Sequence, residues 1–210
     1  MIAVGEAHDR FVERLIEAVR SKGVGPADEP TTAIPPVIDA AARDSILKFI
    51  ELGKREGRCV LAVDVSRQVA ESGGYYVGPH IFVDVPPTAT IAGEEIFGPV
   101  LVVLRATNFD ESIRLFNASD YALAGGVFSR SPENIERARA ECECGNLYIN
   151  RPITGSRVDL QPYGGLKLSG TGVKSGGPDY LLQYCDARTV TENTLRRGFA
   201  PSEEIVEALG

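Results

Sequence analysis

Apolar positions along the chain follow two patterns, one typical of amphipathic helices and the other of buried strands. The helical pattern is clear over residues 6–19, where Phe11, Leu15, Ile16 and Val19 fall on one face. A second helical pattern covers residues 38–55 and ends at Gly57. Its apolar stripe consists of Ile46, Leu47, Phe49 and Ile50.

Two shorter helices are predicted from the residues that begin them. Asn108 has a glutamate three positions later, the spacing of a capping box, so we expect a helix over residues 108–117. Ser131 stands as an N-cap before Pro132, which suits the first helical position, so a helix to about Glu141 is expected.

Short runs that are apolar throughout lie between these helices. They are Cys59–Val63, Ile81–Val85, Val100–Leu104, Gly125–Ser129 and Asn146–Asn150. Strands without alternation are typical of a sheet covered on both faces, so the chain is predicted to be an α/β fold with a largely parallel sheet and helices on both faces. Residues 186–194 do alternate and predict an exposed terminal strand, and residues 202–209 predict a short helix capped by Ser202.

Composition narrows the class of protein. The chain has 210 residues, 43% of them apolar and 24% charged, as in ordinary globular proteins, and its net charge of −7 argues against a nucleic-acid partner. It has no apolar run long enough for a membrane span and no signal-peptide pattern. Four cysteines without such a signal favour a reduced, cytoplasmic setting, and no spacing of cysteine and histidine predicts a metal site.

The stretch GEEIFGPVLVVL, residues 93–104, places charges and a ring at the start of a buried strand. Glu94, Glu95 and Phe97 precede a Gly-Pro breaker and the most apolar run of the chain. One interpretation is a solvated turn before a strand. The other is a ligand site, and the segment alone does not decide between them.

A long glycine-rich loop, residues 150–172, leaves the end of the last predicted buried strand. In open α/β sheets ligands bind at that end. Gly155 and Ser156 would offer two backbone N–H groups and a hydroxyl to a carboxylate, with Tyr163 as an aromatic wall, although a plain surface loop explains the spacing equally well. A phosphate-binding P-loop and a GxGxxG fingerprint are not present, and with only two histidines a Ser/His/Asp triad is not expected.

The motifs EEIFGPV, GGVFSR, GNLYINR, ITGS and QPYGGLKLSGTG occur here in one order. Together they resemble the C-terminal half of the 1-pyrroline-5-carboxylate (L-glutamate γ-semialdehyde) dehydrogenases, in the aldehyde dehydrogenase superfamily. The tail after Thr194 resembles the extension of bifunctional proline-utilisation proteins. The resemblance implies NAD-dependent oxidation of glutamate semialdehyde to glutamate in proline catabolism.

The resemblance also implies roles for particular residues. Glu95 would accept hydrogen bonds from the nicotinamide-ribose hydroxyls of NAD, and Phe97 would pack near the nicotinamide. Gly155 and Ser156 would hold the α-carboxylate of the substrate. Tyr163 stands where the family usually has phenylalanine and adds a hydroxyl to the aldehyde pocket.

The family's cysteine nucleophile, its general-base glutamate and its NAD-binding domain lie upstream of a strand that begins here at Met1. The four cysteines present, Cys59, Cys142, Cys144 and Cys185, do not have the nucleophile's sequence context. We therefore expect no catalytic residue here, with residues 1–184 as the C-terminal portion of a catalytic domain and 185–210 as a terminal strand and tail.

Three interpretations stay open. The chain is expected to be a portion of a longer dehydrogenase that is inactive alone, a non-catalytic binding or oligomerisation module, or one half of a split enzyme. In each case NAD binding should be weak or absent, because only one end of the cofactor is contacted. An apolar face left without its neighbouring domain favours a homo-oligomer.

Overall fold

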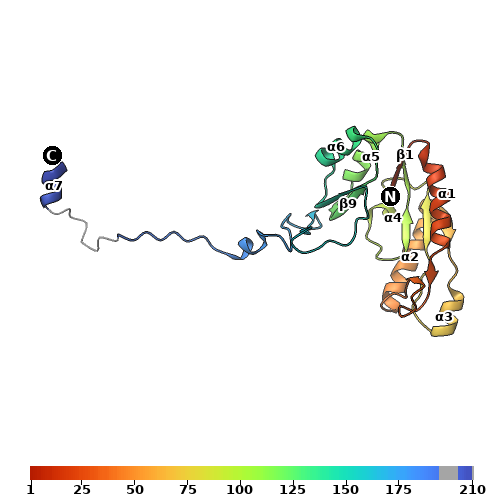
Figure 1. The fold of residues 1–210 in the computed structure, drawn as a ribbon. Coiled ribbons are helices and arrows are strands. Elements are labelled where there is room, and N and C mark those ends of the chain that lie inside the picture. Colours follow the sequence, from red (N-terminus) through yellow and green to blue (C-terminus); the bar gives the residue numbers. More distant parts are fainter. Residues whose placement is uncertain (194–202, 210) are drawn as a thin grey trace. The chain divides into compact units, whose positions relative to one another are not determined.

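The computed structural model describes residues 1–193 and 203–209. The chain divides into two units, residues 1–177 and 178–210, each of which is described by itself (Figure 1). The first unit carries six helices among the described residues: α1 (Ala7–Arg20), α2 (Ala40–Glu56), α3 (Ser66–Ser72), α4 (Thr90–Gly93), α5 (Phe109–Asn117) and α6 (Pro132–Glu141). The second unit carries the 3₁₀ helix η1 (Tyr180–Tyr184) and α7 (Glu203–Leu209).

The strands of the first unit are short. They are β1 (Ile2–Val4), β2 (Gly23–Val24), β3 (Thr32–Ile34), β4 (Arg58–Ala62), β5 (His80–Val83), β6 (Val100–Val102), β7 (Leu104–Ala106), β8 (Tyr121–Ala122), β9 (Ala124–Val127), β10 (Asn146–Ile149) and β11 (Leu166–Lys167). Each apolar run predicted as a strand overlaps one, and the Val100–Leu104 run is divided between β6 and β7.

Parallel pairing dominates, as the sequence predicts. β5 pairs with β6, β1 with β7, β9 with β10 and β2 with β3, all in parallel. β4 lies antiparallel to β5 at the edge of the three-stranded sheet β4-β5-β6, and β8 lies antiparallel to β11. The amino group of Met1 donates to the Val102 carbonyl at 2.7 Å, which joins the start of β1 to β6. The α/β fold with a largely parallel sheet is thus confirmed.

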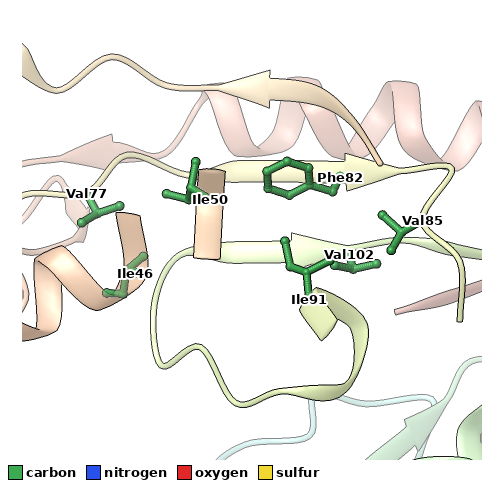
Figure 2. Packing of buried hydrophobic residues seen from close by; sticks show 7 residues of the cluster. All are labelled: Ile46, Ile50, Val77, Phe82, Val85, Ile91 and Val102. Atoms are coloured by element: carbon green, nitrogen blue, oxygen red, sulfur yellow. The ribbon is translucent and has the colours of Figure 1, made fainter. Parts of the chain in front are cut away.

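Alternate residues of β5 enter two separate cores, one on each face of the sheet. Figure 2 shows the first, in which Phe82 of β5 and Val102 of β6 face Ile46 and Ile50 of α2 and Ile91 of α4. On the opposite face the neighbours of Phe82 pack under α1, in a cluster formed by Val12, Leu61, Ile81, Val83 and Val103. Both faces of this sheet are therefore covered by helices.

Helix α2 matches its predicted pattern with one exception. The Asp39 side chain accepts from the Ala42 N–H at 2.7 Å and caps the helix. Ile46 and Ile50 are almost fully buried, but Leu47 is 42% exposed. The inclusion of Leu47 in the buried stripe was wrong, because its position is rotated about 100° from Ile46 and turns toward solvent.

The predicted caps of α5 and α6 are present. Asn108 accepts from the Glu111 N–H at 2.9 Å, and Ser131 accepts from the Asn134 N–H at 3.3 Å. The Glu111 carboxylate returns to the N–H of Thr107 at 2.7 Å rather than to the cap residue itself. The capping box is therefore closed one residue earlier than its usual form.

Two elements are predicted at the end of the chain. The structure assigns no paired strand to residues 186–193, and because a strand is defined by its pairing with a neighbouring strand, the exposed terminal strand stays a prediction. The end of that prediction, Thr194, and the cap residue Ser202 lie outside the described residues. Helix α7 agrees with the predicted terminal helix. In the described part of the chain, no helix has both the length and the apolarity needed to cross a membrane.

Candidate functional site

The segment that carries Glu94 and Glu95 follows directly after the short helix α4. The Glu56 carboxylate, at the end of α2, accepts from the backbone N–H of Ile91 at 2.9 Å and of Thr90 at 3.2 Å. These donors lower the pKa of Glu56 below its ordinary value, because they stabilise the ionised carboxylate. Helix α4 is thus fastened to α2 by a charged cap that comes from outside its own segment.

Phe97 is turned outward by its neighbours. Ile96 packs against the core of Figure 2, and Gly98 lies so close to Ile46 that a Cβ there would be 2.7 Å from two of its carbons. Between them Phe97 has a positive φ of 55° and a ring that is 88% exposed. An aromatic residue rarely adopts that backbone conformation, so the surrounding packing holds the ring toward solvent.

Glu95, two residues before Phe97, is exposed. Its carboxylate makes no hydrogen bond or ion pair with the residues that the structure describes. The segment thus exposes a carboxylate and an aromatic ring two residues apart in sequence. A plain solvated turn does not require an aromatic residue in this strained backbone conformation.

Where the glycine-rich loop leaves β10, two hydrogen bonds join it to the end of the neighbouring strand β9. The Asn150 amide accepts from the Ser129 N–H and donates to the Ser129 carbonyl, both at 2.9 Å. The loop then turns back over β9, where a Cβ on Gly126 would lie 2.6 Å from a methyl group of Ile153. The start of the loop is therefore held against the β9-β10 pair, at the carboxyl end of both strands.

Gly155 and Ser156 follow directly. Gly155 has a φ of 79°, which favours glycine. The Ser156 hydroxyl lies 2.5 Å from the hydroxyl of Tyr148, a residue of β10 that is 6% exposed. The guanidinium of Arg151 lies over the Tyr148 ring, 4.9 Å from its centre. Gly155 and Ser156, which we call the carboxylate seat, thus lie against a buried tyrosine and a half-buried arginine.

Tyr163 is placed by its backbone. Its N–H and carbonyl both pair with Ser175 at 2.9 Å. The Asn146 amide holds the residues on either side, since it donates to the Pro162 carbonyl at 2.9 Å and accepts from the Gly164 N–H at 3.1 Å.

Lys174 also holds the part of the loop around Tyr163. Its ammonium group donates to the Gly145 carbonyl at 2.7 Å and to the Gly164 carbonyl. In the described residues no hydrogen bond or ion pair joins the Glu95–Phe97 segment to the loop that carries Gly155 and Tyr163. Both predicted binding regions belong to the first unit.

Two of the four cysteines have surroundings that disfavour the thiolate. Burial raises the pKa of Cys142 to about 11, with the charges of Cys144 and Glu141 acting in the same direction. Burial also raises the pKa of Cys144. Cys59 donates to the Leu61 carbonyl at 3.2 Å within β4. Within residues 1–193 and 203–209, no group of three or more His, Cys, Asp or Glu side chains is placed to hold a metal ion.

The sequence pointed to Gly155, Ser156 and Tyr163 but not to the residues beneath them. Arg151 could have been noticed, because it is a basic residue directly after a buried strand. Tyr148 reads only as a member of that strand. Its role becomes visible only when the loop folds back so that Ser156 meets its hydroxyl.

Comparison with known proteins gives consistent matches. The chain is 41% identical over 191 residues to a 1-pyrroline-5-carboxylate dehydrogenase of Geobacillus sp. (strain WCH70), covering 91% of this chain and 36% of that protein. It is also 41% identical over 187 residues to 1-pyrroline-5-carboxylate dehydrogenase 2 of Bacillus subtilis (strain 168), covering 89% and 36%. The chain therefore spans about a third of the length of the curated relatives it matches.

Solved structures agree. Proline utilization A from Bdellovibrio bacteriovorus, inactivated by N-propargylglycine, superposes with a TM-score of 0.87 at 50% identity, over 96% of this chain and 20% of that one. A 1-pyrroline-5-carboxylate dehydrogenase from Thermus with bound NAD gives 0.79 at 43% identity, over 86% and 34%. The family model described as "Aldehyde dehydrogenase family" matches residues 1–190. The chain belongs to the aldehyde dehydrogenase family.

Proposed function

We propose that this chain is the part of an NAD-dependent dehydrogenase that holds the α-carboxylate of L-glutamate γ-semialdehyde and the nicotinamide ribose. The reaction of the whole protein would be the oxidation of that aldehyde to L-glutamate in proline catabolism. The names of the matched relatives support this substrate, and the seat at Gly155 and Ser156 is the observation that carries it.

The seat is suited to a carboxylate. Among the described residues, neither the Gly155 nor the Ser156 backbone N–H has an acceptor. Exposed backbone N–H groups next to a hydroxyl form a small concave donor set, and such sets bind anions. The positive φ of Gly155 and its lack of neighbours around the missing Cβ leave room for a ligand there.

NAD would meet this chain at one end only. The free carboxylate of Glu95 would accept from the ribose hydroxyls, and the exposed ring of Phe97 would cover the nicotinamide and exclude water. When bound, NAD supplies the hydride acceptor of the reaction. We expect the 210-residue chain alone to bind NAD weakly or not at all and to show no turnover.

The alternatives are a non-catalytic binding or oligomerisation module and one half of a split enzyme. Several exposed apolar side chains favour association, either with further domains of the same protein or with a second copy: Val158, Leu160, Leu168, Leu181 and Leu182 are each at least 66% exposed. Four free cysteines support a reducing, cytoplasmic location.

The test is a titration of the ¹⁵N-labelled chain with L-glutamate, followed by the backbone amide signals. We expect millimolar binding with the largest shifts at Gly155 and Ser156. 4-Aminobutyrate, which is glutamate without the α-carboxylate, should bind more weakly, and Ser156→Ala should reduce only the glutamate response. Equal responses to both compounds, or shifts confined to other residues, would refute the carboxylate seat.

A further inference from the structure

We propose that Arg151 and Tyr148 are positioning residues that set the donor geometry of the carboxylate seat, an inference that rests on the proposed function of Gly155 and Ser156. Neither residue is assigned to contact the substrate. Arg151 would orient the peptide group that carries the Gly155 N–H, and Tyr148 would orient the Ser156 hydroxyl.

Arg151 is bound to its own loop. Its Nε donates to the Pro152 carbonyl at 3.3 Å, and a terminal nitrogen donates to the Thr154 carbonyl at 3.4 Å. The central carbon of the same guanidinium lies over the Tyr148 ring, 4.9 Å from the ring centre. One planar group thus holds two carbonyls of the loop on the side that faces β10.

The consequence for Gly155 follows from the geometry of the peptide group. A trans peptide is planar, with its carbonyl and its N–H pointing in opposite directions, and the described part of the chain contains no cis peptide bonds. When the Thr154 carbonyl turns toward Arg151, the N–H of Gly155 in the same peptide group must turn away from it. Arg151 therefore directs this N–H outward, where no described residue accepts from it.

Tyr148 performs the matching task for the hydroxyl. At 2.5 Å from Ser156 Oγ, its phenol oxygen can act as donor or acceptor. We assign the donor role to Tyr148, so that the Ser156 proton is free to point at a bound carboxylate. The Tyr148 ring contacts Arg151 and its hydroxyl is hydrogen-bonded to Ser156. This one buried side chain therefore connects the residues that orient the Gly155 N–H and the Ser156 hydroxyl.

Lysine cannot replace arginine in this role. It would keep the positive charge beneath the carboxylate, but it has no planar fork that stacks on a ring while donating to two carbonyls. Arg151→Lys therefore separates orientation from charge. Tyr148→Phe removes one oxygen and keeps the ring that supports Arg151. Arg157→Lys is the matched control, because Arg157 lies in the same loop, is exposed and has no side-chain partner in the described residues.

The experiment uses the ¹⁵N-labelled 210-residue chain and two readouts for each variant. The first is the position and exchange rate of the Gly155 and Ser156 amide signals without any ligand. The second is the ratio of the affinities for L-glutamate and 4-aminobutyrate. We expect Arg151→Lys and Tyr148→Phe each to change the amide signals and to lower the glutamate affinity about three- to tenfold, the range of one lost hydrogen bond, with 4-aminobutyrate unchanged.

A purely structural role would lower both affinities together and leave their ratio as in the wild type, which would overturn the proposal. The proposal would also be overturned if Arg151→Lys kept the wild-type amide signals or the wild-type glutamate affinity, since a positive charge alone would then suffice. If wild-type chain binds no glutamate but the amide signals respond to Arg151→Lys and not to Arg157→Lys, the positioning stands and the proposed function fails.

Discussion

Gly98, the residue after the outward-facing Phe97, is the position where one added methyl group should disturb the core most directly. An alanine Cβ there would lie 2.7 Å from Cδ1 and Cγ1 of Ile46 and 2.9 Å from its Cγ2. Carbon atoms prefer separations of about 3.5–4.0 Å, so all three contacts are too close. Ile46 is 1% exposed and is enclosed by the residues of Figure 2, so it has no free space to turn into.

The expected magnitude combines two opposing effects. Overpacking of a filled core costs about 1–3 kcal/mol. Replacing glycine with alanine also restricts the unfolded chain, which stabilises the folded protein by about 0.4–1 kcal/mol where the backbone allows it. Gly98→Ala should therefore lower the free energy of unfolding by about 1–2 kcal/mol. At about 2–4 °C per kcal/mol for a chain of this size, the melting temperature should fall by several degrees.

Gly93→Ala is the control within the same segment. Gly93 ends α4, its Cβ would meet nothing within 4 Å, and its φ is not positive. This variant should be neutral or more stable by up to about 1 kcal/mol. The chain contains no tryptophan, so urea unfolding is best followed by far-ultraviolet circular dichroism.

A double-mutant cycle tests the cause. If the clash with Ile46 is responsible, Gly98→Ala should cost much less in an Ile46→Ala background, with a coupling energy of about 0.5–3 kcal/mol. Equal stabilities of Gly98→Ala and Gly93→Ala, or the same cost of Gly98→Ala in both backgrounds, would refute the reasoning.

Three further predictions concern charges, caps and thiols. The pKa of Glu56 is lowered by the N–H groups from which its carboxylate accepts, so its contribution to folding stability is complete above the unfolded-state pKa of about 4.3 and is lost as pH falls. In unfolding experiments Glu56→Gln should therefore be less stable than wild type at pH 7, and the two stabilities should converge in acid. Asn108→Ala removes the cap of α5 and should cost about 1 kcal/mol in urea unfolding, whereas no loss would mean that the cap is dispensable. Exposed Cys185 should react with a thiol reagent at pH 8 long before Cys142, whose pKa is raised to about 11, and mass spectrometry of the labelled peptides gives the order.

The main elements could be predicted because their signals are local. Helices α1 and α2 carry a periodic apolar stripe, and the buried strands read as continuous apolar runs because both of their faces are covered. The short elements could not be predicted in this way. α4 has four residues, too few for a period, and its first N–H groups are capped by Glu56, which lies 34 residues earlier.

The same distinction applies to the candidate site. The sequence could point to Glu95, Phe97 and Ser156 through their motifs, and their roles in binding stay predictions. It could not point to Lys174, which reaches a carbonyl 29 residues away, since nothing in the local pattern marks that contact. The alternation in residues 186–193 suggested a strand, but alternation describes only which side chains share a face and does not supply a partner strand.

Both candidate binding regions contain an outward-facing residue with a positive φ, held by neighbours that are fixed elsewhere. Phe97 has a φ of 55° and is held between Ile96 and Gly98, which contact the core. Gly155 has a φ of 79° and is held between a carbonyl bound by Arg151 and a hydroxyl bound by Tyr148. The strain at Phe97 persists only where surrounding contacts over-determine the backbone, whereas the glycine at position 155 adopts its positive φ readily. The contacts that stabilise the fold at these points are therefore also the contacts that present the exposed ring and the free donors, so core packing and ligand binding should respond together to changes at either place.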